Sequence, residues 1–171
     1  MTNRYTSQVN RQLYAANAHL KLLPKPPLNG NQRIVAQALL ESALFHLILA
    51  YKKYLRELAD NYQLANSDSI DSFLGLRQAF VDSDKTPAES NELEVLVNEG
   101  WIGDALASFE IVGEESRSKK LEQQTELLIP LANLGTAYVA KSKPLTQQLL
   151  MQWIESFREL INRHRDIMVE Y

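Results

Sequence analysis

Cysteine is absent from the 171 residues of this chain. Its absence excludes disulfides, zinc–thiolate sites, iron–sulfur clusters and thiol nucleophiles, and it fits a reducing compartment. Apolar residues make up 45% and charged residues 23% of the sequence, close to the average of globular proteins and far from that of disordered chains. We therefore expect residues 1–171 to form a single globular domain that needs no covalent staple.

We expect no secretion signal, because the first twenty residues are polar and amphipathic and contain no continuous apolar segment. The most apolar stretch runs from Ile34 to Tyr51, about the length of a membrane span, but it includes Glu41. An ionised glutamate near the centre of a bilayer would cost roughly 2.5 kcal/mol or more. The sequence thus favours a soluble, cytoplasmic protein without a membrane partner, in which this stretch is a buried helix.

Acidic residues are scarce near the N-terminus and abundant in the middle of the chain. Residues 1–56 contain eight Lys and Arg but only Glu41, whereas residues 57–115 contain fourteen Asp and Glu against two basic residues. Either the two segments pair within the molecule, or their surfaces stay available to a charged partner. The net charge of −3 and the sequence pI near 5.7 disfavour binding to nucleic acid.

Hydrophobic periodicity predicts an all-α fold. Apolar residues recur at three- and four-residue steps from about residue 3 to 23, where Pro24 follows, and again from about 31 to 62 without glycine or proline. The first half of the second segment is apolar on most sides, which is typical of a helix in the middle of a bundle. The turn at Asn29 offers an N-cap for this central helix.

Shorter helices are predicted within residues 64–112, with Asp68 or Ser69 capping one of them and Thr86 capping another. Residues 113–120 are polar and indicate a solvated loop. For the residues up to 143 the pattern does not decide between a broken helix, an extended segment and a mobile segment.

A last helix is predicted from about 144 to 170, with Ser142 as its cap and an apolar seam suited to near-antiparallel packing on the central helix. Together the segments predict an up-and-down helical bundle, with a long central helix at about 31–62, a long C-terminal helix at about 144–170 and several short helices between.

Catalytic and metal-binding motifs are missing. None of the three histidines follows a glutamate at the spacing that di-iron bundles use, and no Walker A loop, GxGxxG, GxSxG or HExxH is present. Asp82 and Asp84 suggest a calcium loop only faintly, because Pro87 stands where such a loop needs glycine. We expect no metal and no cofactor, and the sequence leans away from an enzyme.

Three side chains of the central helix are candidate ligand-binding residues: Glu41, His46 and Tyr51. One interpretation is a small-molecule pocket between helices near His46 and Tyr51. The alternative is that His46 is a half-buried histidine bonded to a neighbour, while Glu41 pairs with a basic residue and specifies which helices meet. Glu41 and His46 lie about 140° apart around the helix, so they are not expected to act together.

The C-terminal helix carries a second pair of candidates, Arg158 and His164. Residues 158–164 match the Arg-x(4–6)-His pattern of the HEPN helical-bundle nucleases, and this resemblance implies that the two side chains assist RNA cleavage or RNA binding. The two residues are about 120° apart around one helix, however. The alternative is a packed histidine flanked by solvated arginines.

A second resemblance covers more of the chain. A proteobacterial family of small helical proteins, classed as a domain of unknown function, is similar to the segments NRQLYAANAHL, ESALFHLILAYKKYLRELADNYQL and FRELINRHRDIMVEY. The resemblance implies a cytoplasmic bacterial protein and supplies no catalytic residue, cofactor or substrate. Our leading hypothesis is a non-enzymatic protein-interaction module that binds a second copy as a homodimer or another protein; a HEPN-like bundle using Arg158 and His164 is the alternative.

Overall fold

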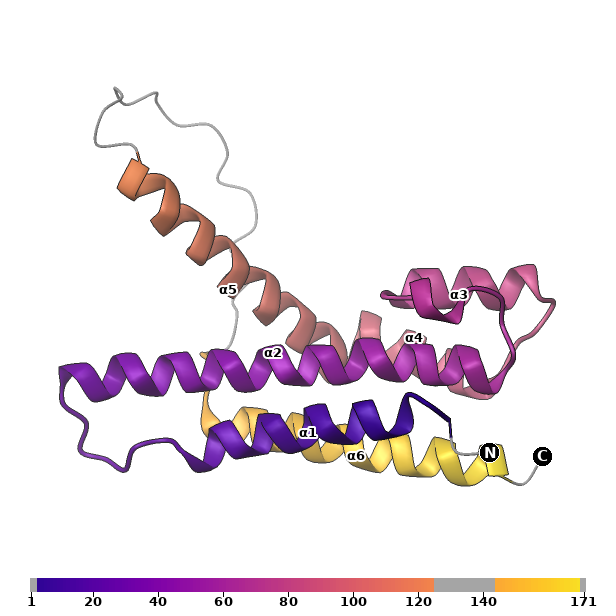
Figure 1. Ribbon diagram of the computed structural model, residues 1–171, viewed down its shortest axis with the longest axis horizontal. Coiled ribbons are helices and arrows are strands. Elements are labelled where there is room, and N and C mark those ends of the chain that lie inside the picture. The colour runs from indigo at the N-terminus through magenta and orange to yellow at the C-terminus, as the bar shows by residue number, and fades with distance from the viewer. Residues whose placement is uncertain (1–2, 125–143, 170–171) are drawn as a thin grey trace.

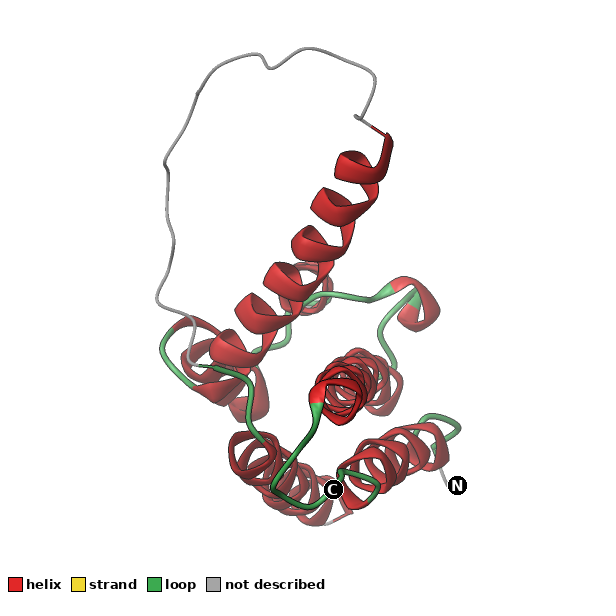
Figure 2. Ribbon diagram, turned by 90° about the vertical axis from the view of Figure 1, so that its left-hand side faces the viewer, coloured by secondary structure: helices red, strands yellow, loops and turns green. Residues whose placement is uncertain are grey.

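The computed structural model describes the backbone of residues 3–124 and 144–169, and the side chains of residues 3–114 and 144–167. Throughout this part of the chain the regular structure is helical, which confirms the predicted all-α fold. Its elements are α1 (Thr6–Lys21), α2 (Gly30–Asn61), the 3₁₀ turn η1 (Ser67–Ser69), α3 (Phe73–Asp82), α4 (Ala88–Asn98), α5 (Trp101–Gln124) and α6 (Gln147–Val169). Figures 1 and 2 show α2 as the axis of the molecule, with α1 and α6 along one side and α3, α4 and α5 along the other.

The helices α1 and α6 pack side by side on α2 but run in opposite directions (Figure 1). Early residues of α1 bond to late residues of α2, so this pair is antiparallel. Tyr51 contacts the ring of Phe157, and further along both helices Glu57 contacts Arg165. Because the two residue numbers rise together, α6 runs parallel to α2, and the predicted near-antiparallel packing of these two helices was wrong.

Local sequence explains where α2 and α3 begin. The Asn29 side chain accepts a bond of 2.9 Å from the backbone N–H of Gln32, whose own side chain accepts one of 3.0 Å from the Asn29 N–H. This reciprocal capping box confirms the predicted start of the central helix. The cap of α3 is Ser72, whose Oγ accepts from the Gly75 N–H.

Three predicted caps differ from the observed ones. Asp68 and Ser69 do not cap α3, because both belong to the separate turn η1. Thr86 does not cap α4, because Pro87 itself occupies the N-cap position and no side chain bonds there. Ser142, the predicted cap of the last helix, lies outside the described residues. Residue types that favour N-caps can thus be recognised in the sequence. The helix that each of them caps is harder to assign.

The loop predicted for residues 113–120 is helical in the structure, because α5 continues to Gln124. Glutamate, lysine and arginine are good helix formers, so a polar segment can extend a helix without an apolar stripe of its own. Residues 125–143, for which the sequence left the conformation open, lie outside the described residues.

The two halves of α2 have different surroundings. Its buried residues run from Ala43 to Ala59, whereas Ile34 and Val35 are 71% and 52% exposed. The expectation that the first half lies in the middle of the bundle was wrong, because α2 is twice as long as α1 and extends past it (Figure 1). By length and composition alone α2 could cross a membrane; 33% of its most apolar 18-residue stretch is buried within the bundle.

Candidate interaction surface

A buried ion pair joins α1, α2 and α6 near the end of α2. Glu57 is 1% exposed, and its carboxylate accepts two bonds from the Arg165 guanidinium, 2.7 Å from Nε and 2.8 Å from Nη2. The hydroxyl of Thr6 donates a third bond of 2.9 Å to the same carboxylate. Such a bidentate pair with a further donor offsets the cost of removing both charges from water. The pair therefore fixes the register of the three helices.

A second buried chain of polar groups joins α2, α6 and α4. The ring of His164 is 1% exposed, and Nε2 lies 2.8 Å from Oε2 of Glu92 while Nδ1 contacts the hydroxyl of Tyr54. Both contacts are hydrogen bonds when Tyr54 donates to Nδ1 and Nε2–H donates to Glu92. Burial raises the pKa of Tyr54 above its ordinary value, so the hydroxyl keeps the proton that this arrangement needs. Both ring nitrogens of His164 are thereby engaged within the fold.

The structure does not bring Arg158 to this histidine. Arg158 is partly exposed and pairs with Glu155, one turn away on α6, at 3.5 Å. It also lines a shallow groove of about 320 Å³ between α1 and α6, together with Tyr14 and Asn162, whereas His164 does not line that groove. RNA cleavage by Arg158 and His164 stays a prediction, and this geometry does not favour it.

Glu41 and Tyr51 also lie apart from each other. Glu41 accepts a bond of 2.8 Å from the Gln37 side chain, one turn earlier on the same helix, so its partner is not the basic residue that we expected. Tyr51 is buried against Phe157 of α6. Its hydroxyl has no hydrogen-bond partner among the described residues, and burial raises its pKa above the ordinary value.

His46 faces α1, as the half-buried alternative predicted. Its Nδ1 lies 2.7 Å from the side-chain oxygen of Gln12, and its ring stacks on that of His19 with centroids 5.2 Å apart. Burial, with the charge of His19, lowers the pKa of His46 below the ordinary 6.5. The three candidates of the central helix are therefore not assembled into one site, and none of them lines the groove between α1 and α6 or a second groove between η1 and α3.

Pairing within the molecule accounts for little of the uneven charge. Among the described side chains of residues 1–56, Arg4 is the one that forms ion pairs with the acidic middle segment, at 3.0 Å from Asp68 and 3.9 Å from Asp60. The buried Glu57 and the partly exposed Glu92 pair instead with residues of α6. Most basic side chains of the N-terminal third are thus left without an acidic partner in the described structure.

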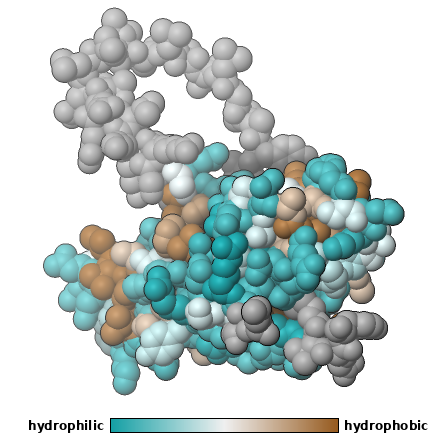
Figure 3. Space-filling model, turned by 45° about the vertical axis from the view of Figure 1, so that its right-hand side comes forward, coloured by the Kyte–Doolittle hydropathy of each residue, from teal (hydrophilic) through white to brown (hydrophobic). Residues whose placement is uncertain are grey.

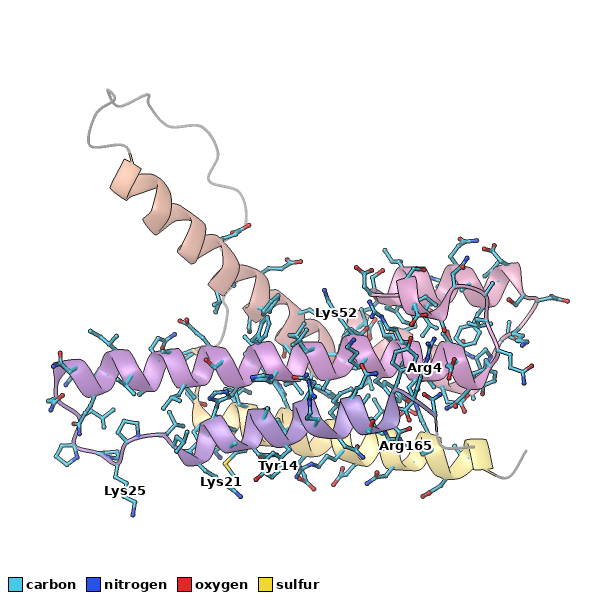
Figure 4. All side chains as sticks on the ribbon, viewed as in Figure 1. Arg4, Tyr14, Lys21, Lys25, Lys52 and Arg165 are labelled. Carbon is cyan, nitrogen blue, oxygen red and sulfur yellow. The ribbon has the colours of Figure 1, made fainter. Side chains whose placement is uncertain are left out.

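The surface where α1 ends and α2 begins carries three of these unpaired basic side chains. We call residues 21–40 the basic tip; this stretch contains no Asp or Glu. Its basic side chains are Lys21, Lys25 and Arg33, and its most exposed apolar side chains are Leu22, Ile34 and Val35. Figure 4 shows Lys21 and Lys25 pointing away from the bundle. Figure 3 shows apolar surface at this end of the molecule among hydrophilic surroundings.

The opposite end of the molecule has the opposite charge. A groove of about 340 Å³ lies between η1 and α3, with Ile70 and Ala79 among its apolar lining residues and Asp71 and Asp82 among its acidic ones. We call this surface the acidic groove. Exposed apolar side chains also occur on the elements around it, at Leu74, Val81 and Val95. Basic and acidic surfaces therefore lie at the two ends of the long axis (Figure 1).

Fold and surface together define an all-helical protein whose buried polar groups join its helices and whose two ends carry unpaired charges of opposite sign. No group of three or more metal-ligating side chains occurs among the described residues. The chain belongs to the family of unknown function DUF6586, whose model matches residues 1–171. This match confirms the expected membership of a family of unknown function. No curated protein and no solved structure matches the chain.

Proposed function

We propose that this protein is a non-enzymatic protein-interaction module whose basic tip binds an acidic protein surface. The observation that carries the proposal is the tip itself, where exposed apolar side chains lie beside unpaired basic ones in a stretch of twenty residues without a carboxylate. Burying the apolar side chains would supply affinity. The basic side chains would steer an acidic partner and exclude a basic one.

The polar groups in the interior support a structural role for themselves. The carboxylate of Glu57 and the ring of His164 each have their partners within the bundle and are almost inaccessible. A catalytic group needs access to its substrate. These groups are suited to holding α1, α4 and α6 on α2, which keeps the first turns of α2 in a fixed position at the tip.

Charge reversal at the tip tests the proposal. The bait is the full chain carrying Lys25→Glu and Arg33→Glu, compared with wild type in a pull-down from cells that naturally produce the protein. A matched control carries Arg11→Glu and Lys52→Glu, which changes the net charge equally outside the tip. Any captured protein, including untagged copies of the chain, is then purified and its binding to each bait is measured directly.

We expect a captured protein to bind wild type and the control alike and to bind the tip variant at least tenfold more weakly, which corresponds to about 1.4 kcal/mol. Binding should also weaken with added salt, because exposed charges are screened. Captured proteins that bind all three baits equally, or no captured protein at all, would refute the proposal.

A further inference from the structure

We infer that the acidic surface bound by the basic tip is the acidic groove of a second copy of this chain, so that copies associate head to tail. The inference rests on the proposed function and names its partner. Charge complementarity selects this occupant: residues 1–56 carry eight basic residues and one acidic, and residues 57–115 carry fourteen acidic and two basic. The tip belongs to the first segment and the groove to the second.

The apolar parts of the two surfaces also match. The tip presents Ile34 and Val35 on the first turns of α2, where both side chains project into solvent. The groove is a concavity with a mixed lining, in which Ile70 and Ala79 are among the apolar residues. Side chains of this kind gain free energy by entering such a concavity. Arg33, next to them on the helix, would then lie close to the carboxylates of the groove.

Carboxylates of the groove are available for this contact. Asp71 is exposed and has no ion pair among the described residues, and Asp82, also exposed, accepts one hydrogen bond of 2.7 Å from the Gln78 side chain on its own helix. On the tip, Lys25 and Arg33 are likewise exposed and without an ion pair in the described structure. Each surface thus lacks the counter-charge that the other would bring.

The positions of the two surfaces determine what kind of assembly forms. Tip and groove lie at opposite ends of the long axis (Figure 1), so a copy bound through its tip keeps its own groove free. An interface between two different patches is heterologous and grows into an open chain unless its rotation closes a ring. We therefore expect association without a fixed dimer, and weak affinity because each patch is small.

A charge swap tests the inference with the full-length protein alone. One variant, with Lys25→Glu and Arg33→Glu, has an acidic tip and an acidic groove. The other, with Asp71→Lys and Asp82→Lys, has a basic tip and a basic groove. Sedimentation gives the average mass of wild type, each variant and their equimolar mixture over protein concentrations from about 10 to 500 μM, at low salt and at about 0.5 M salt, where the screening length falls to a few ångströms.

For wild type we expect an average mass that rises with concentration at low salt and returns to the monomer at high salt. Each variant alone should stay monomeric, because its two ends repel each other. The mixture should regain concentration-dependent growth, because each acidic end then meets a basic one. Circular dichroism and thermal unfolding should show all variants folded. A control with Glu159→Lys and Asp166→Lys, two exposed residues of α6, should associate like wild type.

Three results would overturn the inference. Wild type could be monomeric at every concentration and salt. The groove variant could associate as strongly as wild type, which would indicate tip-to-tip pairing of two copies. The mixture could remain monomeric although each variant is folded. In all three cases the proposed function still stands if a different protein is captured through the tip, so the two failures are distinguishable.

Discussion

The two halves of α2 are similar in apolar content, but one is buried in the core and the other is exposed at the surface. From Ala43 to Ala59 the helix contributes most of its side chains to the core, and its one carboxylate there, Glu57, is buried with Arg165 as its partner. In the first turns, Ile34 and Val35 face solvent and Arg33 has no ion pair among the described residues. Apolar content alone therefore does not identify the buried part of this helix.

The difference in burial between the two halves of α2 follows from the length of the neighbouring helices. Over the second half, α1 and α6 supply both apolar surface and the polar partners of Glu57 and Tyr54. The first turns of α2 extend beyond α1 (Figure 1), and Ile34 and Val35 are exposed there. A helix end with exposed apolar side chains and an unpaired charge is typical of a surface that binds another molecule. We expect the two halves to differ in their contribution to the free energy of unfolding as much as they differ in structure.

The largest effect is expected for Glu57→Ala in the buried half. The substitution leaves the guanidinium of Arg165 without its carboxylate, and breaking a buried ion pair in this way costs about 3 kcal/mol or more. Urea unfolding should show this loss in the free energy of unfolding. The control is Glu155→Ala, which breaks the exposed pair with Arg158 and should change stability by less than about 0.5 kcal/mol. Equal losses of stability for the two substitutions would contradict the assignment of Glu57 and Arg165 as a stabilising buried ion pair.

A matched pair of tyrosines sharpens the comparison within the core. Tyr54→Phe removes the hydroxyl that contacts His164 and should cost about 1 to 2 kcal/mol, because a buried partner is left unpaired. Tyr51→Phe removes a buried hydroxyl that has no partner in the described structure, so it should be neutral or stabilising. Thermal unfolding of both variants measures the difference. A larger loss for Tyr51→Phe would show that this hydroxyl has a partner after all.

A smaller effect is expected for His46, which lies near the start of the buried part of α2. Its pKa is lowered below 6.5 in the folded state, so the unfolded chain binds more protons once the pH falls below 6.5. Stability present above that pH is therefore lost as the pH drops toward the folded-state pKa. In His46→Gln the decline of the urea midpoint from about pH 7.5 to 5.5 should be shallower than in wild type. If the urea midpoints of His46→Gln and wild type declined equally over this pH range, the contribution of His46 to the pH dependence would be refuted.

The smallest effect on stability is expected at the tip. The double variant Ile34→Ser and Val35→Ser changes side chains that are 71% and 52% exposed, so the free energy of unfolding should change by no more than about 0.5 kcal/mol. Leu58→Ala in the other half of the same helix should cost about 2 to 5 kcal/mol, because it leaves a cavity in the core. Chemical denaturation compares the two. A tip variant as destabilised as Leu58→Ala would mean that the tip is packed.

Sequence periodicity predicted the elements better than their arrangement. The bounds of α2 followed from an uninterrupted apolar pattern that begins at a capping Asn29, and the predicted stripe of α1 is buried at Val9, Leu13 and Leu20. Periodicity identifies the face of a helix that is covered, but not the direction of the helix that covers it. The parallel course of α6 on α2 could not be predicted for this reason.

The polar pairs in the core depend on contacts that local patterns do not encode. Glu57 and Arg165 are separated by 108 positions in the sequence, and Tyr54 and His164 by 110. Helical spacing did not mark Glu57 as buried, because it lies about 100° around the helix from Leu58 and therefore outside the main apolar stripe. The partner itself emerges only when the helices are packed.

Solvent access to position 34 tests the contrast between the halves of α2 most directly. Since the chain has no cysteine, Ile34→Cys and Ala43→Cys each introduce a single thiol, and its reaction rate with a thiol reagent reports exposure. In dilute protein at high salt, we predict that the thiol at position 34 reacts nearly as fast as a free thiol and the one at position 43 far more slowly. Equal rates at the two positions, or slow reaction at position 34, would contradict the account.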